Sequence, residues 1–268
     1  TECSITFAQV YDIARNTGAY LVEQLGVDRT PVAVFAGRKM VTPAYFLGVV
    51  YAGRPYAPID ASLPDKRIEK ILENLCPRAI VADRESLEHV ESIVDELAKA
   101  EGFDRPQIFI AEDISRFEQV ACADSNCKIS ESAGDAVTDS ENDMLAAVRR
   151  QMSMTDPLYI IYTSGSTGNP KGVMTSHLSL MTYINAYCDV MHIEESDVLG
   201  NQSPLDYIAA IRDIYLPLKT GCSTAIIPKE YFMEPNALFD YMNEKKVSSV
   251  GWSVSAFTIL TSLGAFEE

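Results

Sequence analysis

Segments with helical periodicity alternate with short apolar runs along this chain, and this alternation limits the possible folds more than any other feature. Residues 6–25 place apolar side chains such as Val10 and Ala14 on one helical stripe, and the apolar run PVAVFA follows from Pro31. Strands separated by helices of this length predict βαβ units, a largely parallel sheet and ligand sites beyond the carboxyl ends of strands. The sequence therefore predicts an α/β fold.

The same alternation continues to the end of the chain. A helix is predicted in PAYFLGVVYAG, and Pro64 opens another in which Ile68, Ile71 and Leu75 recur at helical spacing. Strands are predicted at 55–60, 79–83, 107–111, 158–163, 223–228 and 247–252.

Residues 112–143 interrupt this rhythm. They are rich in Asp, Glu, Ser and Ala, and Arg116 and Lys128 are their basic residues. Such a segment buries too little apolar surface to fold by itself, so we expect a solvated loop, with a regulatory or partner-binding insert as the alternative. DSENDMLAAVRRQ predicts a helix that closes the insert, with Asp139 or Ser140 at its start.

The charge balance excludes several classes of partner. Among 268 residues the formal net charge is −16, and such a surface repels nucleic acid and anionic membranes. The six cysteines show no Cys-x-x-Cys spacing, which favours neither a zinc site nor a disulfide framework and fits a reducing cytoplasm. The sequence has no apolar run long enough to cross a bilayer, and its start does not resemble a signal peptide.

The stretch YTSGSTGNPKG, residues 162–172, predicts a binding site for a polyphosphate. It follows a predicted buried strand, and its glycines permit positive φ and leave main-chain amides uncovered. Exposed successive N–H groups form an anion-binding nest, to which hydroxyl groups and one lysine add donors and a positive charge. The predicted phosphate-binding residues are Thr163, Ser164, Gly165, Ser166, Thr167, Gly168, Lys171 and Gly172.

This loop is not a Walker A motif. Lys171 follows Gly165 as Gly-x-x-x-x-x-Lys, no Gly-Lys pair is present, and no Ser or Thr follows the lysine. The alternative to a phosphate loop is an ordinary flexible turn between a strand and a helix.

The string from Tyr162 to Val173 closely resembles the signature loop of the adenylate-forming enzymes, which include acyl-CoA ligases, luciferases and adenylation domains. The stretches YFLGVVYAGRPYAPID, SLPDKRIEKILENLCPRAIVAD, NQSPLDYIAAIRDIYLPLKTGCSTAIIP and VSSVGWSVSAFTIL are most similar to amino-acid adenylation domains, including those that load D-alanine. The resemblance covers essentially the whole chain. It implies that residues 1–268 form the N-terminal portion of an adenylation domain, with two mostly parallel sheets and without the C-terminal lid, and that this portion alone is inactive.

The resemblance also implies a reaction. A carboxylate attacks the α-phosphorus of ATP, and the acyl adenylate is captured by the thiol of phosphopantetheine on a carrier protein or of coenzyme A. Lys171 and the loop would hold the departing phosphates, and Mg²⁺ would bridge phosphate oxygens with Thr163 as a ligand. A non-catalytic nucleotide-binding or scaffold protein is the alternative.

The same resemblance implies an acyl pocket on a helix near residues 206–212. An ungapped match puts Ile208 where amino-acid adenylation domains carry the aspartate that pairs with the α-ammonium group. A buried ammonium without a partner costs on the order of several kcal/mol, so an amino acid bound in the usual way is not expected. Asp206 and Ala209 belong to the same implied helix, on which Asp206 would point away from the position of Ile208 unless a local bulge brings it into the pocket.

Arg212 has two readings. It lies one helical turn beyond Ile208, where it would favour an acyl group with a negative charge, or else it forms a surface or interdomain salt bridge. On the opposite wall Gly251 would leave room for substrate, and Trp252 is either core packing or a pocket lid. His177, at the start of the helix after the loop, either contacts phosphate or acyl groups or has a capping and packing role.

Overall fold

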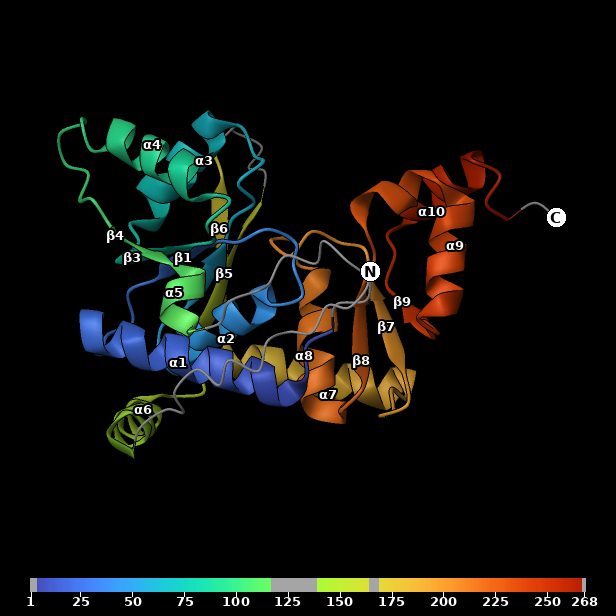
Figure 1. Ribbon diagram of the computed structural model, residues 1–268, viewed down its shortest axis with the longest axis horizontal. Helices are drawn as coiled ribbons and strands as arrows, with labels where there is room; N and C mark the ends of the chain where they lie inside the picture. Colours follow the sequence, from blue (N-terminus) through green and yellow to red (C-terminus); the bar gives the residue numbers. More distant parts are fainter. Residues whose placement is uncertain (1–3, 117–138, 164–168, 267–268) are drawn as a thin grey trace. The chain divides into compact units, whose positions relative to one another are not determined.

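The computed structural model describes residues 4–116, 139–163 and 169–266, except for the side chains of residues 139–142 (Figure 1). The chain divides into two compact units, one up to Leu178 and one from Ser179. The fold is α/β, as predicted.

A six-stranded sheet forms the centre of the first unit. Its strand order is β4-β3-β1-β2-β5-β6, and all neighbours are parallel except β5 and β6, which are antiparallel. Strands β1 to β3 are fully buried, as expected for parallel strands covered on both faces. The strands are β1 (Val32–Phe35), β2 (Tyr56–Pro58), β3 (Ala79–Ala82), β4 (Gln107–Ile110), β5 (Pro157–Thr163) and β6 (Lys171–Ser176).

Helices cover both faces of this sheet (Figure 1). α3 and α4 pack on one face, where Ile68, Leu72 and Val94 join Phe35 and Ile80 in a continuous core. α1 packs against α2, α5 and α6 in the same unit. The helices are α1 (Phe7–Leu25), α2 (Thr42–Tyr51), α3 (Asp65–Leu75), α4 (Leu87–Leu97), α5 (Ala111–Ser115) and α6 (Asp139–Gln151).

Two glycines bring α1 and α2 into close contact. A methyl group on Gly48 would lie 2.5 Å from the Thr17 side chain, and one on Gly18 would lie 2.6 Å from Cβ of Tyr51. Larger side chains would force the helices apart. These glycines therefore fix the spacing of the two helices, which carry several side chains of a cavity described below.

The second unit contains a three-stranded parallel sheet in the order β8-β7-β9. Its core includes Ile227, Phe232, Leu238, Ala256 and Leu260. Its elements are β7 (Val198–Asn201), α8 (Ala210–Thr220), β8 (Ser223–Ile226), the 3₁₀ helix η1 (Lys229–Met233), α9 (Pro235–Glu244), β9 (Ser249–Val250) and α10 (Val254–Ser262), while α7 (His177–Met191) starts two residues before the boundary.

Two strands were not predicted. β6 lies where the sequence predicts the end of a loop, and most of its side chains are exposed, so no apolar pattern marks it. β7 is four residues long and contains Gly200 and Asn201, which have low strand propensity. Both strands form because a neighbouring strand completes their hydrogen bonds.

The predicted insert is partly helical. α5 makes residues 112–115 helical, so the start of the 112–143 segment is corrected from loop to helix. The predicted helix DSENDMLAAVRRQ is confirmed as α6, whose capping side chains lie outside the described residues, as do residues 117–138. Among the helices described, none is long and apolar enough to cross a membrane.

Candidate functional site

Strands β5 and β6 hold the two ends of the predicted phosphate loop. Thr163 ends β5 and pairs across the ladder with Lys171, the first residue of β6. Side chains directly opposite each other in an antiparallel pair lie on the same face, and both of these are exposed. The Thr163 hydroxyl donates a 3.5 Å hydrogen bond to the carbonyl of Lys171. The remaining predicted phosphate-binding residues other than Gly172 lie outside the described residues: Ser164, Gly165, Ser166, Thr167 and Gly168.

Gly172 is required for a different reason from the one the sequence suggests. It lies inside β6, opposite Tyr162, and it is not among the described glycines with positive φ. A methyl group there would lie 2.9 Å from Cγ2 of Ile160 and 3.1 Å from Cζ of Tyr162. Gly172 therefore gives space to the Tyr162 ring rather than flexibility to the loop.

Helix α3 supports the hairpin from the face that carries Tyr162. The Tyr162 hydroxyl donates a 2.8 Å hydrogen bond to Oδ1 of Asn74. Burial raises the pKa of Tyr162 to about 12, so the phenol remains a donor at neutral pH. One turn earlier on α3, Nζ of Lys70 donates a 3.1 Å hydrogen bond to Oδ1 of Asn169, the first loop residue described after residues 164–168.

Lys70 is a candidate binding residue that the sequence alone does not reveal. Its spacing of four from Asn74 places both on one face of α3, and that face touches the hairpin at Tyr162 and Asn169. The structure thus brings a second lysine to the base of the loop that precedes Lys171.

The residues predicted to line an acyl pocket lie in the second unit, but not all on a helix. Asp206, Ile208 and Ala209 precede α8, which begins at Ala210. Here the backbone forms turns, with the amide of Ala210 bonded to the carbonyl of Tyr207 at 3.0 Å. Ile208 is 51% exposed. The helical geometry expected for Asp206 and Ile208 is therefore corrected.

Arg212 is buried within this unit and already paired. Its Nε donates a 2.5 Å hydrogen bond to Oδ1 of Asp213, and its Nη1 donates a 3.1 Å bond to the hydroxyl of Tyr187. Asn201 holds the other oxygen of Asp213 at 3.0 Å. Burial lowers the pKa of Arg212, but Asp213 and Tyr187 more than reverse this effect and the pKa is raised. The Arg212–Asp213 pair is buried within one unit, so the expectation of a surface or interdomain salt bridge is corrected.

Gly251, expected on the opposite wall of the acyl pocket, lies against the Arg212 side chain. A methyl group on Gly251 would overlap Nη1 of Arg212, so the guanidinium fills the space that the sequence assigns to substrate. The Trp252 ring packs edge-on against Phe232 and Phe257, with centroids 6.2 and 5.5 Å away. These contacts match the core-packing role of Trp252.

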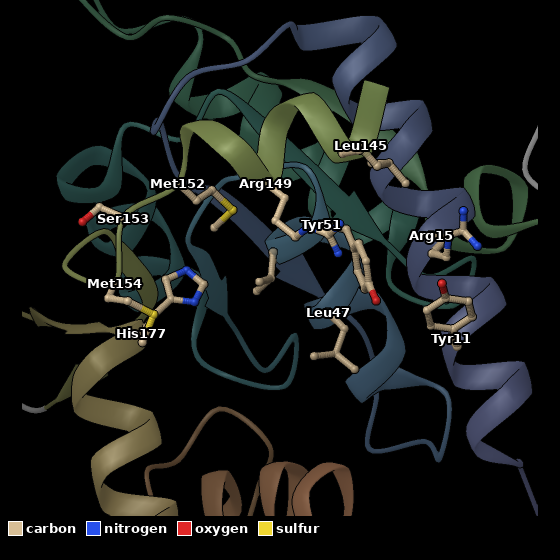
Figure 2. Close-up of a pocket in the computed structure, with 12 residues that line it drawn as sticks. Tyr11, Arg15, Leu47, Tyr51, Leu145, Arg149, Met152, Ser153, Met154 and His177 are labelled. Carbon is tan, nitrogen blue, oxygen red and sulfur yellow. The ribbon is translucent and has the colours of Figure 1, made fainter. Parts of the chain in front are cut away.

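His177 lines a cavity of the first unit, together with side chains of α1, α2 and α6 (Figure 2). Burial lowers the pKa of its imidazole, an effect that Asp156 partly opposes. No group of three or more His, Cys, Asp or Glu side chains within the described ranges is arranged to hold a metal ion.

Comparisons with known proteins agree with this architecture. A D-alanine–D-alanyl carrier protein ligase of Bacillus velezensis is 26% identical over 247 residues, which are 91% of this chain and 42% of that protein. The chain thus spans less than half the length of this curated relative.

Two solved structures share the fold. The inhibitor-bound N-terminal domain of FACL13 from Mycobacterium tuberculosis aligns with a TM-score of 0.75 and 18% identity, covering 98% of this chain and 60% of that one. ATP-bound MatB from Rhodopseudomonas palustris aligns with a TM-score of 0.71 and 17% identity, covering 97% and 48%. The family model described as AMP-binding enzyme matches residues 1–268. The chain therefore belongs to the AMP-binding enzyme family, within the adenylate-forming superfamily.

Proposed function

We propose that this chain takes part in the ATP-dependent activation of a carboxylic acid, an amino acid or a related acyl acid, as an acyl adenylate. The acyl group then passes to the phosphopantetheine thiol of a carrier protein. The observation that carries this proposal is the β5–β6 hairpin, which sets Thr163 and Lys171 on one face at the two ends of the loop. Membership of a family for which ATP binding is typical supports it.

The proposed chemistry depends on charge neutralisation rather than on a strong base. A carboxylate oxygen of the acid forms a bond to the α-phosphorus of ATP, and the bond to the bridging oxygen breaks as pyrophosphate leaves with the electron pair. The loop amides, its hydroxyls and Lys171 would stabilise the developing charge on pyrophosphate. Lys70, held 3.1 Å from Asn169, adds a cation at the base of the loop.

The nucleotide would enter as its magnesium complex. Thr163 offers one exposed hydroxyl beside the loop, and a single neutral oxygen does not hold Mg²⁺ by itself. Phosphate oxygens would therefore supply most of its ligands. When bound, the ion neutralises charge on the phosphates.

The described residues of the proposed pocket do not favour an amino acid bound in the usual way or a second carboxylate on the acid. Ile208 offers no partner for an α-ammonium, and the Arg212 charge is balanced by Asp213. A buried ion pair of this kind holds its neighbours in place and leaves no net charge to attract a second carboxylate. We therefore do not propose that Arg212 selects an anionic acyl group.

The acceptor is proposed from the relatives. The matched Bacillus velezensis protein is named a carrier protein ligase, which favours a carrier protein over free coenzyme A. In the transfer step the thiol sulfur forms a bond to the acyl carbon, AMP leaves with the electron pair, and the thiol loses its proton.

ATP–pyrophosphate exchange with a panel of carboxylic acids, measured on the intact protein, tests the activation step. One acid should support exchange, and Lys171→Ala should reduce it about 100-fold. Lys99→Ala is the control and should leave the exchange rate unchanged. Lys99 is an exposed lysine that follows α4 and pairs with Glu96. Absence of exchange with every acid, while ATP still binds, would favour the scaffold alternative.

The acceptor is tested separately. Product formation with a phosphopantetheinylated carrier protein is compared with formation using free coenzyme A. Equal or faster transfer to coenzyme A would overturn the proposed carrier acceptor and leave the activation step intact.

A further inference from the structure

A cavity of 660 Å³ lies in the first unit, and Thr163, Lys171 and Gly172 are not among the residues that line it. Its walls come from α1, α2, α6, the segment after α6 and the first residue of α7 (Figure 2). A volume of this order is typical of small-molecule sites, which lie between about 300 and 1,000 Å³. None of the described residues of the predicted phosphate loop or acyl pocket lines it.

Part of the lining is apolar. Leu47 and Val50 of α2 and Leu145 and Ala146 of α6 line the cavity. Met152 and Met154 continue this surface, and thioether side chains adapt readily to ligands of irregular shape. The cavity therefore suits a ligand with an apolar body.

Two arginines flank Tyr51 in the same cavity. Arg15 reaches in from α1 and Arg149 from α6 (Figure 2). The guanidinium of Arg15 lies 4.9 Å from the centroid of the Tyr11 ring, and the Tyr11 and Tyr51 rings meet edge-on at 6.3 Å. Stacking on Tyr11 orients the Arg15 guanidinium without neutralising it.

Neither arginine has a carboxylate partner within the part of the chain that the structure describes. Elsewhere in this unit Arg29, Arg54 and Arg105 each pair with an aspartate. In a chain with a net charge of −16, two arginines facing one cavity without acidic partners indicate a site for an anion.

The neighbouring groups fit an anionic ligand. Burial and Tyr11 raise the pKa of Tyr51, and Arg15 and Arg149 oppose this rise only in part. The Tyr51 phenol therefore stays protonated at neutral pH and can donate a hydrogen bond. Burial lowers the pKa of His177, so the positive charge of the site comes from the two arginines and not from the imidazole.

We propose that this cavity binds a small amphipathic anion, with an apolar chain or ring against α2 and α6 and one anionic head group between Arg15 and Arg149. Carboxylate and phosphate head groups share the required chemistry, because both accept paired N–H bonds from guanidinium groups. The cavity shares none of its lining residues with Thr163, Lys171 or Gly172, and this proposal does not rest on the proposed activity.

Fluorescence titration of the intact protein with anilinonaphthalene sulfonate, an aromatic anion, tests this site. The Arg15→Gln, Arg149→Gln double variant should bind the probe at least about tenfold more weakly, a loss of about 1.4 kcal/mol. Arg150→Gln is the matched control, because Arg150 is an exposed neighbour on α6 that does not line the cavity. Equal effects of the double variant and the control would overturn the proposal.

Competition identifies the head group. Octanoate or octyl phosphate should displace the probe, and the stronger competitor of the two identifies the preferred head group. Octanol, which has no charge, should displace the probe at least about tenfold less well. Displacement by octanol that equals that of both anions would overturn the anion site.

A second variant guards against misfolding of the double variant. Ala146→Phe fills the cavity and keeps both arginines, so it should abolish the same component of probe binding while circular dichroism stays unchanged. Lys171→Ala should leave probe binding intact, which separates this site from the proposed activation reaction. Unchanged binding in Ala146→Phe would refute the cavity as the site.

Discussion

The guanidinium of Arg212 lies against Gly251 so closely that a methyl group on Gly251 would come 2.7 Å from Cζ of Arg212. Arg212 is 4% exposed and is held by Asp213 and Tyr187, so it has little freedom to move aside. The glycine is therefore a packing requirement of a buried ion pair. A substrate-binding role for Arg212 would require this pair to rearrange.

Gly251→Ala should lower the free energy of unfolding by about 1–3 kcal/mol, because the added methyl group overpacks the guanidinium. Urea denaturation measures the loss. The matched experiment repeats Gly251→Ala in an Arg212→Met background. The flexible methionine side chain can move away from the added methyl group. The cost should be clearly smaller there, and an equal cost in both backgrounds would contradict the contact as its cause.

Arg54→Met should destabilise the first unit by about 2–4 kcal/mol, because it removes the hydrogen bonds of a buried charged donor to three backbone carbonyls. The Arg54 side chain is fully buried, pairs with Asp28, and donates to the carbonyls of Thr30, Leu25 and Gly26 at 3.1 to 3.2 Å. Two of these carbonyls lie at the C-terminal end of α1, so the substitution leaves that end unsatisfied.

An exposed ion pair provides the control for Arg54. Arg105→Met removes the pair with Asp95, in which both side chains are at least half exposed, and should cost less than about 1 kcal/mol. Thermal denaturation of both variants measures the difference. Similar losses would show that burial of Arg54 is not the source of its contribution.

Asp83 should make stability depend on acidic pH. Burial raises the pKa of Asp83, but Lys39 at 2.8 Å, the Gly37 amide and Ser86 outweigh it, so the pKa lies below its ordinary value of 3.8. A carboxyl whose folded pKa is depressed stabilises the protein above its unfolded pKa, and this contribution disappears as pH falls through the folded pKa.

Asp83→Asn should therefore cost about 2 kcal/mol at neutral pH and progressively less below about pH 4. Urea denaturation across this range measures the change. Asp104→Asn, in an exposed loop, should show no such trend. A cost for Asp83→Asn that does not change with pH would exclude the charge as its origin.

His177 should make stability fall on mild acidification. Burial lowers the pKa of His177 below its ordinary value of 6.5, so the unfolded chain takes up a proton before the folded protein does. Stability is then complete above the unfolded pKa and decreases as pH falls towards the folded pKa. His177→Gln should flatten this slope between about pH 7 and 5.

Nuclear magnetic resonance titration of the imidazole checks the same prediction directly. For the stability measurement, His192→Asn is the control, and it should leave the slope with pH unchanged. His192 is exposed, and asparagine tolerates its φ of 51°. A His177 resonance that titrates above 6.5 would reverse the sign and refute the prediction.

The sequence predicts most of the first unit because the patterns are local. Buried parallel strands such as Val32–Phe35 are continuous apolar runs, and α3 carries Ile68, Ile71 and Leu75 on one stripe. The composition of the loop from Thr163 to Gly172, and its place after a buried strand, are likewise readable in one segment. These features were enough to indicate the family.

Other features depend on segments far apart in the chain. Gly200 is surrounded by Val247, Val250 and Ile227, and a methyl group on it would lie 2.9 to 3.2 Å from each of them. A strand that looks too weak by propensity is therefore fixed by its neighbours. The exposed residues of β6 form a strand because β5 offers an edge for hydrogen bonding.

By itself the sequence determined the α/β architecture and most strand positions, and it predicted the residues of a phosphate loop, since each follows from periodicity or composition within a short segment. Only the tertiary structure decided that Arg212 is neutralised by Asp213, that Gly172 makes space for Tyr162, and that Arg15 and Arg149 share a cavity. The physical reason is that the energy of a buried charge or a close contact depends on which distant group meets it. That partner is chosen by the packing of the whole unit.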